Sequence, residues 1–197
     1  MNDNIIYGKK VILFALELVD LPHFIKLHRE DKKGNLQEMC LREMSEEEAE
    51  RYIRALLLTG QIKVWSVYTK DMKNPHRIGF IYLHNMTSFS TGMAGEMDSE
   101  IVKGLGKIIR NGKYTYSEDT SRTLIDFCFN RLNLHRVETS ILESNHRSLL
   151  LTKKVGWREE GKARDAIKIG ENEYKNLILL SILNKDWKNG KSERSIN

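Results

Sequence analysis

The sequence lacks several features that would assign it to particular protein classes. Its 197 residues include only two cysteines, Cys40 and Cys128, which are too few for a disulfide framework. Neither cysteine, and none of the six histidines, lies in a spacing typical of metal ligands. No apolar run reaches the roughly 20 residues that span a bilayer. These absences argue against a disulfide-stapled protein, a membrane-spanning protein and a metal enzyme.

Positive charge is present but scattered along the chain. The formal net charge is +5, yet lysine and arginine do not gather into one basic arm, and no aromatic-rich RNA-binding signature accompanies them. We therefore predict no direct nucleic-acid binding, although an anionic small ligand is compatible with this balance. The first ten residues are polar and lack the apolar core of a secretory signal, which predicts a cytoplasmic protein.

Length and composition favour one globular domain. Hydrophobic residues make up 40% and charged residues 30% of the chain, close to the average of soluble proteins, and the length suffices for one well-buried core. No internal repeat or low-complexity linker divides the sequence. We expect a single domain over residues 1–187, followed by a frayed polar tail at residues 188–197.

The first part of the chain predicts a strand and two helices. Residues 11–18 form an apolar stretch of strand length, and Asp20 then supplies a helix N-cap. Ser45 and Glu48 have the spacing of a capping box, in which each side chain satisfies a backbone donor of the other residue. A second helix therefore begins after Ser45, and Gly60 can end it in the left-handed conformation.

The middle of the chain predicts a hairpin and one less regular strand. Residues 64–68 and 78–83 are rich in β-branched and aromatic side chains, which favours two antiparallel strands. Glycine, serine and methionine interrupt any alternation across residues 86–109, where we expect one further strand.

The last part of the chain alternates between helix and strand. Residues 118–133 have an apolar stripe with the helical period, residues 135–142 alternate as a strand, and residues 145–155 are again helical up to a stop at Gly156. A polar turn within residues 163–183 predicts a closing hairpin. The elements together predict a mixed α/β sheet packed by about four helices.

Residues 145–157 hold the most informative motif. Each of them has an ordinary structural explanation when it is taken singly, as a helix cap, a core side chain or a helix stop. Together they match the pattern N-x-x-S-x-x-L-x-x-K-x-G-aromatic at Asn145, Ser148, Leu151, Lys154, Gly156 and Trp157. With the preceding residues 132–137, this motif resembles the GNAT superfamily of N-acetyltransferases, and in particular the branch that acetylates the N-termini of ribosomal proteins.

The resemblance implies both a fold and an activity. The implied fold is α/β (α+β), with a mixed, mostly antiparallel central sheet of about six to seven strands and about four flanking helices. The implied activity is acetyl-CoA-dependent transfer of an acetyl group to a primary amine, with a protein N-terminus as one acceptor. Two alternatives stay open: a binding or regulatory module that keeps the fold without turnover, and a polyamine or aminoglycoside acetyltransferase. The oligomeric state is also open, with a homodimer as one alternative.

The resemblance further implies a cofactor loop ahead of the central helix. In the family, a glycine-rich loop and a helix N-terminus offer backbone N–H groups to the pyrophosphate of coenzyme A. Here the loop departs from the glycine pattern, since Thr115 replaces the middle glycine, and an ordinary turn before a helix is the alternative. The residues assigned to the cofactor site are Arg110, Gly112, Lys113, Thr115, Tyr116, Ser117 and, from the later motif, Asn145.

Direct acetyl transfer needs a neutral amine, stabilisation of the oxyanion and a proton for the departing thiolate. Many family members donate this proton from a tyrosine, but Thr152 stands at that position here. By resemblance to the ribosomal-protein branch, Ser148 becomes the predicted donor, against a packing or capping role. Glu100 is the predicted base, and an ordinary exposed surface carboxylate is the competing interpretation. Glu96, His84 and His135 are the alternative bases, with a structural role favoured for His135.

Overall fold

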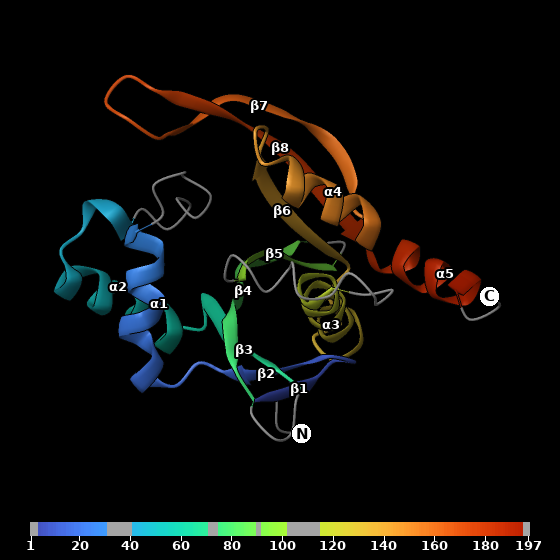
Figure 1. Cartoon of the computed structure of the whole chain (residues 1–197). Helices are drawn as coiled ribbons and strands as arrows, with labels where there is room; N and C mark the ends of the chain where they lie inside the picture. Colours follow the sequence, from blue (N-terminus) through green and yellow to red (C-terminus); the bar gives the residue numbers. More distant parts are fainter. Residues whose placement is uncertain (1–3, 31–40, 71–74, 90–91, 102–114, 195–197) are drawn as a thin grey trace.

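The computed structural model describes residues 4–30, 41–70, 75–89, 92–101 and 115–194, and it contains one sheet and five α-helices (Figure 1). The strands are β1 (Ile5–Tyr7), β2 (Val11–Ala15), β3 (Ile62–Thr69), β4 (Arg77–Phe89), β5 (Gly92–Ile101), β6 (Arg136–Leu142), β7 (Arg158–Lys168) and β8 (Tyr174–Leu183). The helices are α1 (Leu21–Glu30), α2 (Glu46–Leu58), α3 (Tyr116–Asn130), α4 (His146–Val155) and α5 (Asn184–Arg194), with short 3-10 turns η1 (Leu18–Asp20) and η3 (Leu41–Glu43).

The sheet is mixed and mostly antiparallel. Its eight strands lie in the order β1-β2-β3-β4-β5-β6-β8-β7, and every neighbouring pair is antiparallel except β5 and β6. Parallel neighbours need a crossover connection, and α3 lies in the connection between β5 and β6. The sheet type agrees with the prediction. The strand number is higher than the expected six to seven, because short strands such as the three-residue β1 give little sequence signal.

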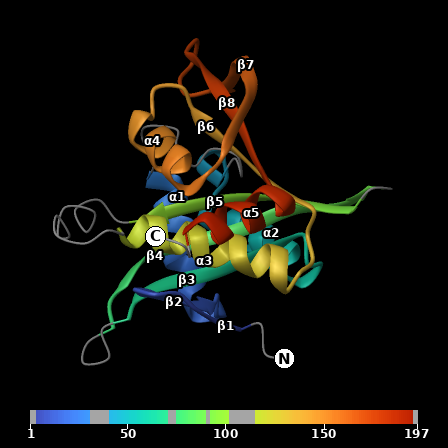
Figure 2. The ribbon, with the colours of Figure 1, turned by 90° about the vertical axis from the view of Figure 1, so that its right-hand side faces the viewer.

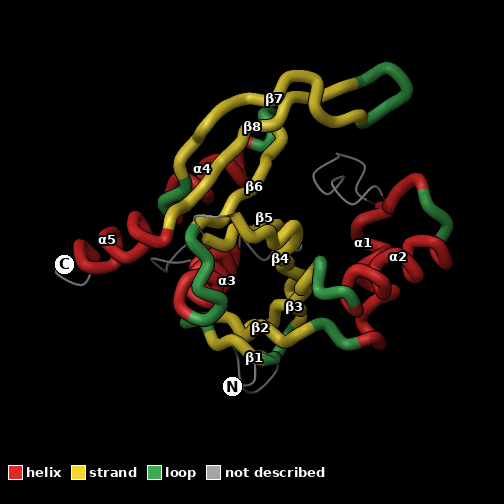
Figure 3. The backbone as a smooth tube through the Cα atoms, turned by 180° about the vertical axis from the view of Figure 1, so that it is seen from behind, coloured by secondary structure: helices red, strands yellow, loops and turns green. Residues whose placement is uncertain are grey.

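Helices cover both faces of the sheet. Figure 1, and Figure 3 from behind, show α1 and α2 on one side of β3 and β4 and α3 on the other. Alternation along β3 explains this arrangement, since Val64 packs with the α1–α2 cluster and the next residue, Trp65, packs with the α3 cluster. The core therefore consists of two buried clusters, one on each face.

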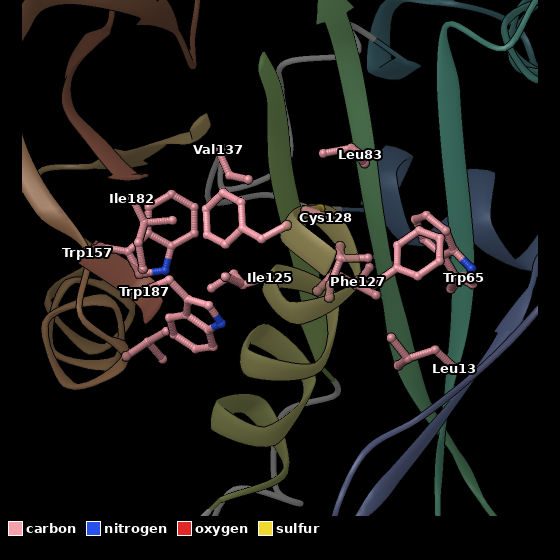
Figure 4. Close-up of a cluster of buried hydrophobic side chains, with 14 of the residues drawn as sticks. Leu13, Trp65, Leu83, Ile125, Phe127, Cys128, Val137, Trp157, Ile182 and Trp187 are labelled. Atoms are coloured by element: carbon pink, nitrogen blue, oxygen red, sulfur yellow. The ribbon is translucent and has the colours of Figure 1, made fainter. Parts of the chain in front are cut away.

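The α3 cluster joins the two ends of the sheet. The rings of Trp65 and Phe127 meet edge to face with 5.5 Å between their centroids. On the opposite side of the helix, Ile125 lies toward Trp157 and Trp187 (Figure 4). Viewed from the α5 side, α3 crosses the β3–β4 part of the sheet below β6–β8 (Figure 2). The helix thus connects β2–β4 with β6–β8.

Local capping signals in the sequence are confirmed. Ser45 Oγ accepts a hydrogen bond from Glu48 N at 3.2 Å, and Glu48 Oε2 accepts one from Ser45 N at 2.8 Å, so the predicted capping box starts α2. Gly60 and Gly156 have φ values of +71° and +112°, the left-handed conformation expected after α2 and α4.

The first strand and helix differ in detail from the prediction. β2 ends at Ala15 rather than at residue 18, because η1 intervenes before α1. Asp20 does not cap α1 as expected. It lies in η1, where its carboxylate forms an ion pair with Arg77 and accepts a hydrogen bond from Ser66 Oγ at 3.3 Å. The carboxylate therefore connects η1 to β3 and β4 instead.

Two segments carry more structure than the sequence indicated. Within residues 86–109, β4 extends to Phe89 and β5 follows from Gly92 to Ile101; residues 108 and 109 lie outside the described part of the chain. The expected frayed tail is helical as far as Arg194, because α5 runs from Asn184 to Arg194, and residues 195–197 lie outside the described part of the chain. Trp187 anchors α5 to the core, because the residue is 3% exposed and its Nε1 donates a hydrogen bond to Asp126 Oδ1 at 2.5 Å.

Several chemistries find no support in the described residues. Cys128 is buried as predicted, and burial raises the pKa of its thiol to about 12, which disfavours a thiolate nucleophile; Cys40 lies outside the described residues. Within the described ranges, no cluster of histidine, cysteine and carboxylate side chains could hold a metal ion. None of the helices in these ranges is long and apolar enough to cross a membrane.

Candidate active site

The parallel ladder between β5 and β6 is short. It pairs Ala94 with Arg136, Gly95 with Val137 and Glu96 with Glu138. Beyond these pairs β5 continues along β4, while β6 continues along β8. Among the described residues, the two strands therefore separate after Glu96 and Glu138. We call this point the fork.

Two helices begin beyond the carboxyl ends of these strands. α3 follows β5 and α4 follows β6 in the chain (Figure 1). In α/β sheets, ligands bind in the crevice beyond the carboxyl ends of parallel strands, where helix N-termini also offer unpaired backbone N–H groups. The fork and the two helix starts are therefore the candidate site.

The start of α3 contains the described part of the predicted cofactor loop. Thr115 is the N-cap, and its Oγ1 accepts a hydrogen bond from Glu118 N at 3.1 Å. Tyr116 and Ser117 form the first turn and are half-buried, with Tyr116 packed against the α3 cluster. The other assigned loop residues, Arg110, Gly112 and Lys113, lie outside the described residues.

The start of α4 contains two more of the predicted residues, Asn145 and Ser148. Asn145 is the N-cap, and its Oδ1 accepts a hydrogen bond from the backbone N–H of Ser148 at 3.3 Å. The Ser148 side chain is half-buried, and its Oγ has no hydrogen-bond partner among the described residues. Asn145 and Ser148 therefore lie in one turn, with the serine hydroxyl available for another contact.

Thr152 is engaged within its own helix. Its Oγ1 donates to Leu149 O at 2.9 Å, and the residue is 8% exposed. A hydroxyl that is buried and bonded in this way is poorly placed to donate a proton to a ligand. The structure thus supports the expectation that Thr152 does not replace the family tyrosine.

Glu100 lies on β5 beyond the fork. Its backbone pairs with Phe80 of β4, and Glu96 pairs with His84 on one side and Glu138 on the other. The β4–β5 register is regular from Gly79 to His84, so no bulge occurs at Glu100. The irregularity lies between His84 and Thr87 instead.

Two buried carboxylates at the start of α3 are absent from the predicted site. Asp119 Oδ2 accepts hydrogen bonds from Lys10 N at 2.6 Å and Val11 N at 3.2 Å. A Cβ atom on Gly8 would lie 2.7 Å from this oxygen, so the β1–β2 turn approaches α3 as closely as glycine allows. No local signal indicates this contact, because the partners are more than 100 residues apart.

Glu118 is the second missed carboxylate. Its side chain is 2% exposed and pairs with Arg122 and Lys154, which links α3 to α4. The spacing of Thr115 and Glu118 has the form of a capping box, and this was the one signal that could have indicated the residue. The carboxylate contacts the two cations in the structure.

An ion-pair network covers the sheet face beside the fork. Arg136 bonds to Glu138 and, through both terminal nitrogens, to Glu160, which also accepts a hydrogen bond from Ser181 Oγ at 2.7 Å. These bonds lower the pKa of Glu160 to about 2, with the Arg136 hydrogen bonds as the largest cause, and raise the pKa of Arg136. Val137 between them is buried toward α3, so Arg136 and Glu138 point to the face opposite α3.

A pocket of about 530 Å³ lies on another part of this face. It is lined by β2, β3 and the η1 region, including Phe14, Tyr68 and Val19. β3 is separated from β5 by β4, so the pocket does not reach the fork.

Comparison with known proteins identifies the family. An acetyltransferase (GNAT) domain matches residues 10–158, which is most of the chain. This chain belongs to the GNAT family. The match, together with the observed sheet, confirms the family and the fold that the 145–157 motif predicts. It also agrees with the predicted enzyme class and with acetyl-CoA as the cosubstrate.

Individual relatives are similar over part of their length. A "Probable N-acetyltransferase", YjcK of Bacillus subtilis, is 36% identical over 76 residues, which are 39% of this chain and 41% of that protein. YdaF of the same species, whose name assigns it provisionally to the ribosomal N-acetyltransferases, is 33% identical over 70 residues, 36% of this chain and 38% of that protein. The matched part of the chain thus spans about two fifths of each relative's length.

A solved structure is similar over nearly the whole chain. The spermidine N-acetyltransferase from Vibrio cholerae, crystallised with CoA and spermine, has a TM-score of 0.74 and covers 91% of this chain and 99% of its own. The sequence identity is 19%. At this identity the likeness establishes the common fold.

Proposed function

We propose that this protein is an acetyl-CoA-dependent N-acetyltransferase that acetylates a primary amine by direct attack in a ternary complex. The observation that carries the proposal is the fork between β5 and β6, with the starts of α3 and α4 beyond it. Membership of the GNAT family supports the same activity. An opening in a sheet lets an extended ligand reach from one face to the other, which suits a thioester that must meet an acceptor.

In this proposal the two helix starts have different tasks. The N-terminus of α3 at Thr115 binds the pyrophosphate of the cosubstrate through backbone N–H groups, together with the predicted loop residues Arg110, Gly112 and Lys113. Tyr116 and Ser117 extend this contact in the first turn. Asn145 fixes the start of α4 near the acyl-bearing arm.

The chemistry moves one proton off the acceptor ammonium, one off the attacking nitrogen and one onto the departing thiolate. Glu100 accepts a proton from the ammonium group of the acceptor, directly or through water, and the neutral amine attacks the thioester carbonyl carbon. The carbon–nitrogen bond forms, the carbon–sulfur bond breaks, and Ser148 Oγ donates its proton to the departing thiolate. The attacking nitrogen loses its second proton to solvent as the amide forms, and Ser148 regains a proton from solvent. No covalent enzyme intermediate is required.

The proposed acceptor is a protein N-terminal amine. Its support is the resemblance of the 145–157 motif to the ribosomal-protein branch and the similarity to YdaF. A polyamine is the second candidate, because the structurally similar Vibrio cholerae enzyme acts on spermidine. The described carboxylates near the fork give the polyamine little extra support, since Arg136 already binds both Glu138 and Glu160.

A non-catalytic module is the rival hypothesis. Its motivation is Thr152, whose hydroxyl is used within α4 and leaves the usual tyrosine role unfilled. Cytoplasmic location and a homodimer remain predictions from the sequence, and light scattering of the purified protein measures the oligomeric state.

Calorimetric titration with acetyl-CoA, followed by thiol release with an amine panel, tests the proposal. We expect saturable binding and thiol release with a peptide N-terminus, with spermidine and an aminoglycoside as comparison acceptors. Binding without thiol release from any acceptor would favour the module. No binding at millimolar acetyl-CoA would contradict both hypotheses.

A further inference from the structure

Glu118 is the centre of an ion-pair network between α3 and α4. Its Oε1 accepts hydrogen bonds from Arg122 Nε at 3.1 Å and Nη2 at 3.0 Å, and Lys154 Nζ lies 2.5 Å from its Oε2. The glutamate side chain is 2% exposed, and that of Arg122 is 12% exposed. We call these three residues the α3–α4 bridge. The bridge places one buried anion between two cations from neighbouring helices.

Arg122 also holds the end of α4 directly. Its Nη2 donates to Lys154 O at 2.8 Å and its Nη1 to Val155 O at 3.3 Å. These carbonyls belong to the last turn of α4, where no intrahelical donors remain. The guanidinium lies 5.8 Å from the centroid of the Trp187 ring of α5. The bridge therefore fixes the last turn of α4 against the first turn of α3.

This contact connects the two helix starts of the proposed site. Glu118 is three residues after the cap Thr115, at the expected pyrophosphate end. Lys154 is six residues after Ser148 on α4, about 9 Å along the helix axis. Because a helix transmits a displacement of one turn to the next, the position of Lys154 also sets the position of Ser148.

We propose that Glu118 is a positioning residue, which acts through Arg122 and Lys154 to hold Ser148 at a fixed distance from the N-terminus of α3. This inference rests on the proposed function, because that distance matters only if one cosubstrate contacts both helix starts. A displacement of about 1 Å can reduce a reaction rate by up to about 100-fold when the donor must meet a bound substrate.

Variants that remove one charge of the bridge can distinguish a positioning role from a direct effect of charge on cofactor binding. A negative charge in the first turn of a helix disfavours an anionic ligand at that N-terminus, and a positive charge favours it. Glu118→Gln should therefore leave acetyl-CoA affinity unchanged or raise it, by up to about fivefold, whereas Lys154→Met should lower it by about two- to fivefold. Both variants should lower kcat by about tenfold, because both remove the ion pair between Glu118 and Lys154 that joins the two helices.

The experiment measures the Kd of acetyl-CoA by calorimetry and kcat by thiol release for the wild type, Glu118→Gln, Lys154→Met and the double variant. The double variant restores the charge balance, so its Kd should return toward the wild-type value while kcat stays low. Lys154→Arg keeps the cation and should retain most of the wild-type kcat. Glu50→Gln is the matched control. It removes a glutamate–arginine ion pair of the same i,i+4 spacing on α2, where Arg54 Nη2 lies 2.6 Å from Glu50 Oε1.

The outcomes distinguish this inference from the proposed function. Absent binding or turnover in the wild type overturns the proposed function. An active wild type whose variants keep kcat, or lose it only where affinity falls, overturns the positioning role. If Glu118→Gln does not fold by circular dichroism, Lys154→Met and Lys154→Arg still decide, because the lysine side chain is 53% exposed.

Discussion

The two helices that begin beyond the parallel strands differ in their first turns. α3 starts with two buried carboxylates, Glu118 and Asp119, which are both bound to other parts of the protein. α4 has no acidic residue in its first turn, and Asn145 and Ser148 there are only half-buried. The first turn of α3 is therefore largely occupied by structural contacts, whereas that of α4 includes the half-buried Ser148 side chain, whose Oγ has no hydrogen-bond partner among the described residues.

This difference indicates that the two helix starts have different roles, one structural and one chemical. Buried carboxylates at a helix N-terminus stabilise the helix but oppose an anion there unless cations neutralise them. Around α3, Arg122 and Lys154 supply that neutralisation for Glu118, and backbone N–H groups bind Asp119. We infer that rigidity comes from α3 and reactivity from α4.

The largest expected effect is the loss of stability when Asp119 is replaced. Asp119→Ala removes the acceptor of the Lys10 and Val11 N–H groups, and buried donors without partners are costly. We expect the free energy of unfolding to fall by about 3 kcal/mol, measured by urea denaturation. Glu171→Gln, in the exposed β7–β8 turn, is the control. A loss of unfolding free energy below about 1 kcal/mol would contradict the idea that the buried carboxylates of α3 have a structural role that α4 lacks.

Ser148→Ala should affect catalysis rather than stability. The hydrogen bond to Asn145 uses the backbone N–H of Ser148, so the cap of α4 survives the substitution. If Ser148 donates the proton, kcat should fall about 100-fold, which corresponds to about 2.7 kcal/mol. Thr152→Val is the matched variant on the same helix, and it should change kcat by less than about threefold. Equal losses in both variants would contradict the assignment of Ser148.

The same comparison shows where sequence reasoning succeeds. Asn145, Gly156 and the Ser45–Glu48 capping box are local signals, and the structure confirms each of them, because partners three or four residues apart are visible in the sequence. The fold was predictable because the 145–157 motif, which covers a complete helix with its cap and stop, resembles a family whose fold is known.

The contacts around α3 were not predictable from local patterns. Asp119 bonds to residues more than 100 positions away, and nothing near it in the sequence indicates them. β5 was difficult because Gly92 and Gly95 interrupt the alternation that identifies strands. α5 has a polar sequence, and among its described residues Trp187 is the buried side chain that packs it against the core. Each of these features depends on tertiary contacts rather than on propensity.

The N-cap side chains of α3 and α4 should have smaller effects that are equal for the two helices. Thr115→Ala and Asn145→Ala each remove an acceptor for an N-terminal backbone N–H group, at 3.1 and 3.3 Å respectively. Each should cost about 1 kcal/mol of unfolding free energy, and so should Ser45→Ala on α2. Only the first two should also weaken acetyl-CoA binding in calorimetry. An equal loss of affinity in Ser45→Ala would mean that the effect is global and not local to the site.

The smallest expected effect concerns a carboxylate that is exposed, in contrast to the buried pair on α3. The Arg136 hydrogen bonds lower the pKa of Glu160 to about 2 from 4.5, so its stabilising contribution is complete above about pH 5 and is lost as the pH falls toward 2. Because the side chain is 43% exposed, solvent screening limits the contribution to at most about 1 kcal/mol.

Glu160→Gln should therefore lower the free energy of unfolding slightly at pH 7, and the difference from the wild type should disappear as the pH approaches 2. Urea denaturation at pH 7, 5, 4 and 3 measures this convergence, with Glu171→Gln as the exposed control that should show none. A difference that stays constant across these pH values would show that Glu160 stabilises the sheet by packing and not through its charge. In that case Glu160 could not serve as an exposed, charge-dependent counterpart to the buried Glu118 of the α3–α4 bridge.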